Sequence, residues 1–146
     1  MMRDRGSVVL IENNKIALIK RTKDGSVYYV FPGGGIEDGE TPEEATKREA
    51  LEELGVEVKV KECIAKIIFN GTQYFYLVEI INGTFGTGKG AEFTKESKDR
   101  GTYLPMWIDI EMLSTINVVP KEVALNVKSI YLSQFCAHTI TSYNPR

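Results

Sequence analysis

Three glutamates at the end of a predicted helix are the residues whose type and spacing best suit chemistry. Glu49, Glu52 and Glu53 stand at positions i, i+3 and i+4, which places their side chains on one helix face. Like charges repel at this spacing, and the negative end of the helix dipole lies close by. A divalent cation removes both penalties, because Mg²⁺ binds a few carboxylates and completes its coordination with water and substrate phosphates. The three glutamates therefore predict a metal site.

Two neighbouring features extend this prediction. Arg48 lies four residues before Glu52 and can orient its carboxylate. Upstream, Gly33–Gly35 predict a flexible loop whose backbone can approach a metal or a phosphate closely. The alternative is a solvated acidic surface, but such a surface usually carries Lys four residues after Glu, whereas Glu53 follows Glu49 at that spacing.

The helix that carries these glutamates has a clear start and a clear end in the sequence. Thr41 is a typical N-cap, and Glu44 three residues later completes a capping box. Gly55 is a typical helix stop. Projected at about 100° per residue, the glutamates fall opposite a set of apolar residues that we expect to pack into the core: Ala50, Leu51 and Leu54.

The elements that must position this helix predict a mixed sheet. Stretches rich in β-branched and aromatic residues predict strands at 7–11, 15–21, 27–31, 56–69, 73–81 and 103–110. Asn13-Asn14 and Asn70-Gly71 predict tight hairpin turns. A second helix is predicted to begin near Pro120. Strands with helices before and after them predict one α/β domain over residues 1–146, with a mixed sheet covered on both faces.

The spacing of the acidic residues matches a known signature. From Gly34 the sequence reads "GGIEDGETPEEATKREALEELGV", with Glu40, the Arg48-Glu49 pair, the Glu52-Glu53 pair and Gly55 at the positions that the signature requires. This pattern resembles the Nudix box of the Nudix hydrolases. It departs from the usual pattern at Ala50, where a bulkier aliphatic residue is more common, although the apolar character is kept.

The resemblance implies a Nudix-like α/β/α sandwich and hydrolysis of the diphosphate linkage of a nucleoside diphosphate derivative with Mg²⁺ or Mn²⁺. It implies that Glu40 braces a loop and Arg48 orients a carboxylate. The glutamates Glu49, Glu52 and Glu53 become metal ligands and catalytic groups. The resemblance also implies that the backbone of Gly33, Gly34 and Gly35 binds the metal or phosphates, with Gly34 as a metal ligand. Lys20 and Arg21, at the end of a predicted strand, are candidates to bind phosphates through their side chains.

A further catalytic carboxylate often comes from a late loop in this family. Residues 83–102 are rich in Gly and charge, so we expect a substrate loop there. Glu92 is the preferred candidate because Gly and Ala precede it, and Glu96 is the alternative. The substrate stays open among nucleoside triphosphates, nucleotide sugars and dinucleoside polyphosphates. The spacing of Tyr74 behind the box is similar to that of the dinucleoside polyphosphate branch.

The amino-acid composition of the chain limits the classes of partner that we expect it to bind. With Lys+Arg 18 against Asp+Glu 20, the chain has no basic field for a nucleic acid polymer, and its apolar runs are too short to span a membrane. Cys63 and Cys136 are far apart and predict reduced thiols in a cytoplasmic protein. We expect a small-molecule nucleotide partner and leave a homodimer open. Two other functions remain as alternatives: a catalytically inactive Nudix-like module that senses nucleotides, and an acidic interaction domain without metal.

Overall fold

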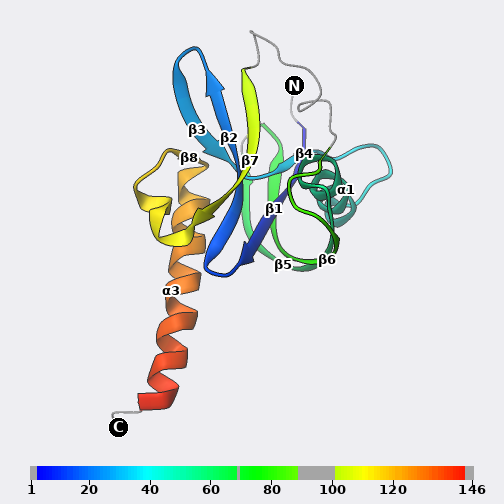
Figure 1. Ribbon diagram of the computed structural model, residues 1–146. Helices are drawn as coiled ribbons and strands as arrows, with labels where there is room; N and C mark the ends of the chain where they lie inside the picture. Colours follow the sequence, from blue (N-terminus) through cyan, green and yellow to red (C-terminus); the bar gives the residue numbers. More distant parts are fainter. Residues whose placement is uncertain (1–2, 69, 89–100, 144–146) are drawn as a thin grey trace.

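The computed structural model describes residues 3–68, 70–88 and 101–143, with side chains up to Ser133. These residues form a curled, mixed sheet (Figure 1). Its strands follow the order β5-β6-β1-β2-β3-β8, while β4 pairs with β1 and β7 pairs with β2. The strand bounds are β1 Arg5–Glu12, β2 Lys15–Lys23, β3 Ser26–Val30, β4 Gly33–Gly35, β5 Val56–Ile68, β6 Thr72–Gly83, β7 Thr102–Asp109 and β8 Val118–Val119.

The sheet is mixed because two of its strand pairs are parallel. β1 runs parallel to β6, and β3 runs parallel to β8, whereas the other pairs are antiparallel. The predicted hairpin turns are both present. Asn13 and Asn14 have φ of 52° and 64°, and Asn70 and Gly71 have φ of 53° and 102°, the left-handed region that these residue types tolerate. The mixed sheet predicted from the sequence is confirmed.

In the part of the chain that the structure describes, two α-helices and one 3₁₀ helix accompany the sheet: α1 Pro42–Leu54, η1 Ile110–Ser114 and α3 Lys121–Tyr143. The predicted capping box of α1 is present. Thr41 Oγ1 accepts from Glu44 N at 3.1 Å, and Thr41 N donates to Glu44 Oε1 at 2.8 Å. Gly55, at φ 79°, ends the helix and donates to Leu51 O at 3.0 Å. Within the described residues, no helix combines the length and apolar character needed to cross a membrane.

The core lies on both faces of the sheet. Val8 and Leu10 of β1 pack on the α1 side, and Val9 between them packs on the opposite side with Val123 and Val127 of α3. Figure 1 shows α1 and α3 on opposite sides of the sheet, and α3 continuing well beyond it. The predicted α/β/α sandwich is therefore confirmed.

Two details of the sequence prediction are wrong. Gly33–Gly35 do not form a loop: they form β4, which pairs antiparallel with the start of β1. Leu51 does not pack into the core, since it is 52% exposed, whereas Glu49 and Glu53 are each only 6% exposed. The helix turns these two glutamates, together with Ala50 and Leu54, toward the sheet and β4. An apolar face therefore does not by itself define the buried side of α1.

Candidate active site

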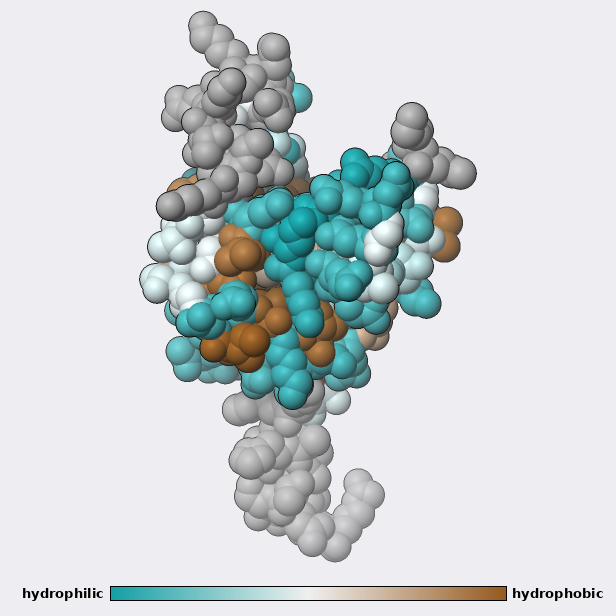
Figure 2. Space-filling model, turned by 90° about the vertical axis from the view of Figure 1, so that its right-hand side faces the viewer, coloured by the Kyte–Doolittle hydropathy of each residue, from teal (hydrophilic) through white to brown (hydrophobic). Residues whose placement is uncertain are grey.

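A cavity of about 540 Å³ lies where α1 and β4 meet the ends of β2, β3 and β7. Its charged side chains are four arginines and four glutamates: Arg3, Arg5, Arg21, Arg48, Glu37, Glu49, Glu52 and Glu53. The three glycines of β4, three apolar residues and Tyr103 complete the lining. We call it the acidic cavity. Seen from the side of α1, the surface of the molecule is largely hydrophilic, with an apolar area below (Figure 2).

Arg48 organises the carboxylates of this cavity. Its Nε donates to Glu40 Oε2 at 2.7 Å, and its Nη2 donates to Gly35 O at 2.9 Å and to Glu40 Oε1 at 3.1 Å. Its Nη1 donates to Glu49 Oε2 at 3.0 Å and to Glu52 Oε1 at 3.3 Å. The planar guanidinium thus links the β4 backbone, the loop before α1 and two helix carboxylates in one network.

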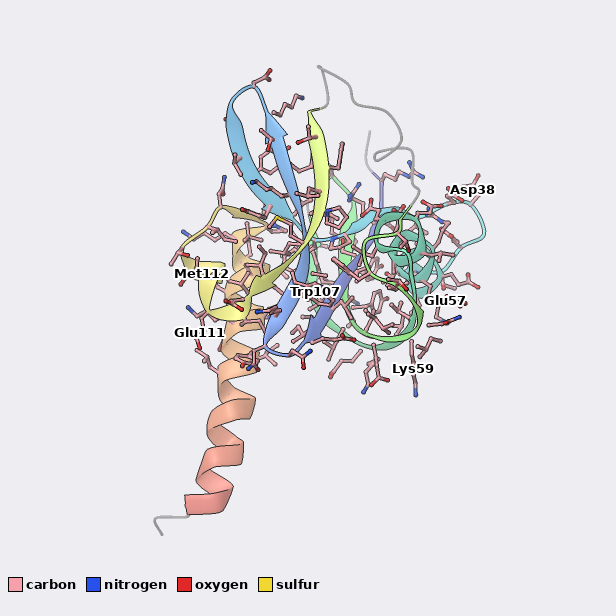
Figure 3. All side chains as sticks on the ribbon, viewed as in Figure 1. Asp38, Glu57, Lys59, Trp107, Glu111 and Met112 are labelled. Carbon is pink, nitrogen blue, oxygen red and sulfur yellow. The ribbon has the colours of Figure 1, made fainter. Side chains whose placement is uncertain are left out.

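Glu40 holds the loop between β4 and α1. Its Oε1 accepts from Glu37 N at 3.0 Å. The hydrogen bond from Arg48, followed by that from the Glu37 backbone, lowers the pKa of Glu40, and the same pairing with Glu40 raises the pKa of Arg48. Both groups therefore stay charged near neutral pH. Asp38, at the outer end of this loop, points away from the molecule (Figure 3).

The two buried glutamates lie directly against β4. Glu53 Oε1 accepts from Gly33 N at 3.0 Å. A Cβ atom at Gly34 would collide with Glu49 Oε2, so the carboxylate and the strand can be this close only with glycine at position 34. The backbone of β4 and the carboxylates of α1 therefore form one continuous polar wall.

The donor set of this wall suits a hard divalent cation, because Glu49, Glu52 and Glu53 offer carboxylate oxygens and β4 offers backbone carbonyls. Within the described residues, however, no three acidic, His or Cys side chains converge as a ready metal site. Arg48 pairs with Glu49 and Glu52, while the Gly33 amide binds Glu53. The carboxylates would have to reorient toward a cation.

The phosphate-binding candidates separate in the structure. Arg21 lines the acidic cavity, with its Cζ 3.8 Å from the centre of the Tyr103 ring. Lys20 is not among the described residues that line it, because adjacent residues of a strand point to opposite faces. Arg3 and Arg5 line the cavity and were not predicted. The sequence did contain a pattern that could have indicated them. Arg3 and Arg5 are two residues apart just before a predicted strand, and this spacing places both side chains on one face of an extended chain.

A second cavity, of about 570 Å³, adjoins the first. Phe31 and Phe75 meet edge to face within its lining, with ring centroids 5.4 Å apart. The other lining residues are Arg5, Ser7, Val30, Ile67, Ile68, Gln73, Val119, Pro120, Lys121 and Glu122. More of its exposed lining is apolar than polar, so we call it the apolar cavity. Arg5, Val30 and Phe31 belong to both cavities.

Tyr74 lies elsewhere. It lines a third cavity with Tyr76 and several lysines, and the two tyrosine rings are nearly parallel with centroids 6.2 Å apart. Burial raises the pKa of Tyr76 to about 12. Lys59, also in this lining, lies at the edge of the molecule in Figure 3. The position of Tyr74 therefore gives no support to dinucleoside polyphosphate binding at the glutamates.

The start of the predicted substrate loop packs on the end of α1. Gly86 N donates to Leu54 O at 2.9 Å. Phe85 contacts Trp107 of β7, a residue near the centre of Figure 3, with ring centroids 4.6 Å apart. Gly83 and Thr102, at the ends of the predicted loop, belong to β6 and β7. Glu92 and Glu96, the two candidate loop carboxylates, lie outside the residues that the structure describes.

Comparisons with known proteins identify the family of this chain and agree with its fold. The NUDIX domain family matches residues 2–119. The nucleoside triphosphatase NudI of Enterobacter sp. (strain 638) is 30% identical over 132 residues, covering 80% of this chain and 90% of the relative. The 8-oxo-dGTP diphosphatase of Escherichia coli (strain K12) is 37% identical over 79 residues, covering 49% and 61%. A NUDIX hydrolase structure from Nitrosomonas europaea shares the fold, with a TM-score of 0.68, 17% identity and coverage of 91% and 90%.

Proposed function

Because this chain belongs to the Nudix hydrolase family, as the match over residues 2–119 shows, we propose that it is a metal-dependent enzyme that cleaves the diphosphate linkage of a nucleoside diphosphate derivative. The observation that carries the proposal is the acidic cavity itself, where two buried glutamates face a glycine strand and arginines line the same space. Such a cavity can hold a cation and the phosphates that it neutralises.

The carboxylates of Glu49, Glu52 and Glu53 would hold Mg²⁺ or Mn²⁺, with the backbone carbonyl of Gly34 as a further oxygen ligand. Bound there, the cation supplies Lewis-acid chemistry by neutralising phosphate charge and activating water. Arg48 orients the carboxylates of Glu49 and Glu52 through its Nη1 donor. Because Arg48 is fixed to Glu40 and Gly35, it can keep this position when the carboxylates turn toward the cation.

The phosphates of the substrate would be bound by Arg21 and by the amides of β4. Arg21 stacks against Tyr103, so its guanidinium is held at the cavity by the ring as well as by the strand. Glu92 or Glu96 would add a carboxylate from the late loop. Among the three open substrate classes, the match to a nucleoside triphosphatase over 80% of this chain favours a nucleoside triphosphate. The cytoplasmic location and the homodimer remain predictions.

A turnover assay across nucleoside triphosphates, nucleotide sugars and dinucleoside polyphosphates tests the proposal. Each substrate is incubated with Mg²⁺, with Mn²⁺ and with excess EDTA, and the products are separated by ion-exchange chromatography. We expect cleavage of the diphosphate linkage only with a divalent cation. Full activity in excess EDTA contradicts metal dependence. Nucleotide binding without turnover on any substrate supports the alternative, a catalytically inactive module that senses nucleotides.

A further inference from the structure

The acidic and apolar cavities meet at the first residue of β1. In the sheet, Arg5 pairs with Gly35 of β4 on one side and with Gln73 of β6 on the other. Gly35 lines the acidic cavity and Gln73 lines the apolar cavity. Arg5 therefore stands at the junction of the two spaces, and its side chain takes part in lining both.

No other charged side chain in the described part of the chain has this position. Arg3, Arg21 and Arg48 line the acidic cavity alone, and Lys121 lines the apolar cavity alone. The Arg5 side chain is exposed, and its hydrogen bond to the Gly33 carbonyl is long, at 3.5 Å from Nη2. A contact of this length does little to fix the guanidinium, which can therefore turn toward a ligand.

The shape of a nucleoside diphosphate derivative matches this arrangement. Its base is flat and largely apolar, its diphosphate is charged, and the phosphate attached to the nucleoside stands between them. A base in the apolar cavity and a reacting diphosphate beside the glutamates would bring that linking phosphate to the junction. A guanidinium matches a phosphate there, because its planar donors bind two phosphate oxygens at once.

We propose that Arg5 binds the phosphate directly attached to the nucleoside, and so fixes the nucleoside relative to the reacting diphosphate. The inference rests on the proposed function for the position of the reacting diphosphate. It adds a phosphate-binding residue at the junction and assigns the apolar cavity to the nucleoside. A consequence is that a nucleoside monophosphate, which has the linking phosphate but no diphosphate, should bind without any metal.

Calorimetric titration of the full chain in EDTA tests this without turnover. The ligands are the common ribonucleoside and deoxyribonucleoside 5′-monophosphates and the corresponding nucleosides. For the best-bound base, we expect Arg5→Gln to weaken monophosphate binding at least tenfold and to leave nucleoside binding within about twofold. Arg5→Lys keeps the charge but loses the planar donor pair, so it should restore part of the affinity.

Lys59→Gln is the control for loss of a positive charge, because Lys59 is an exposed residue that lines the third cavity and neither of these two. It should change monophosphate binding by less than about threefold, and thermal melts establish that each variant is folded. The inference is overturned if no monophosphate binds the parent, if Lys59→Gln and Arg5→Gln weaken binding equally, or if Arg5→Gln weakens nucleoside binding as much as monophosphate binding. These results differ from failure of the proposed function, which is an absence of metal-dependent cleavage in the parent protein.

Discussion

The acidic cavity and the apolar cavity are similar in volume and share a wall, yet their linings have little else in common. The acidic cavity is lined by four glutamates and four arginines. Among them, the guanidinium of Arg48 binds both Glu49 and the backbone of β4. The apolar cavity has two phenylalanines in edge-to-face contact and few charges. We have proposed that the acidic cavity performs the chemistry and that the apolar cavity binds the nucleoside, and the two linings are suited to these separate roles. Variants that affect one cavity alone can test this proposal.

The largest expected effect is at Glu53. Glu53→Gln keeps the side chain's shape and an oxygen that can accept from Gly33 N, but it removes the charge. We expect the turnover rate to fall at least about a hundredfold, as for other lost transition-state contacts. Without metal the variant should melt no lower than the parent, because one like-charge repulsion is gone, and it should gain less from added Mg²⁺.

Glu62→Gln is the control for this experiment, since Glu62 is an exposed residue of the third cavity. It should keep parental activity and a parental response to Mg²⁺ in thermal melts. Parental activity in Glu53→Gln would remove Glu53 from the chemistry. A lower melting temperature in that variant, with activity unchanged, would make the buried glutamate a structural residue only.

A smaller effect is expected at Arg48. Arg48→Lys keeps a positive charge, but a single ammonium cannot reach Glu40, Gly35 and the helix carboxylates together. We expect the free energy of unfolding, measured in urea, to fall by about 1–3 kcal/mol. The kcat/KM value should fall about tenfold, or about 1.4 kcal/mol. Lys47→Gln, at the exposed neighbouring position, should change neither value appreciably.

A change in the apolar cavity should affect binding and leave chemistry intact. Gln73→Ala removes a side chain able to hydrogen-bond the edge of a base. Loss of one such bond, about 0.5–1.5 kcal/mol, corresponds to a rise in KM of about 2-fold to 12-fold with kcat nearly constant. Tyr74→Phe, on the neighbouring residue in the third cavity, should leave KM unchanged. A rise in KM for Tyr74→Phe, with the KM of Gln73→Ala unchanged, would place the nucleoside at Tyr74 and favour the dinucleoside polyphosphate interpretation.

The smallest effect concerns acid stability. The folded-state pKa of Glu40 lies below its ordinary value of about 4.3, because of Arg48 and the Glu37 amide. Its charge therefore contributes to stability above that pH, and the contribution is lost as the pH falls through the folded-state pKa. Thermal melts of the parent and of Glu40→Gln should differ by a constant amount between about pH 6 and 8. The difference should shrink below about pH 4, and a constant difference down to pH 3 would contradict the assignment.

The sequence by itself determined the features that depend on near neighbours. The capping box of Thr41 and Glu44, the end of α1 at Gly55 and the Asn13-Asn14 turn each involve residues a few positions apart. Such interactions form within one turn or one helix end, so their geometry follows from local residue types and spacing. The contact between Arg48 and Glu52, one helical turn apart, belongs to the same class.

Tertiary structure decided which residues share a cavity. Arg5, Gly35 and Gln73 are far apart in sequence and become neighbours only through the register of β1 with β4 and β6. The burial of Glu49 beside Ala50, and the exposure of Leu51, likewise depend on how α1 meets the sheet and β4. Strand register and helix orientation are set by the packing of the whole core, which no short stretch of sequence contains.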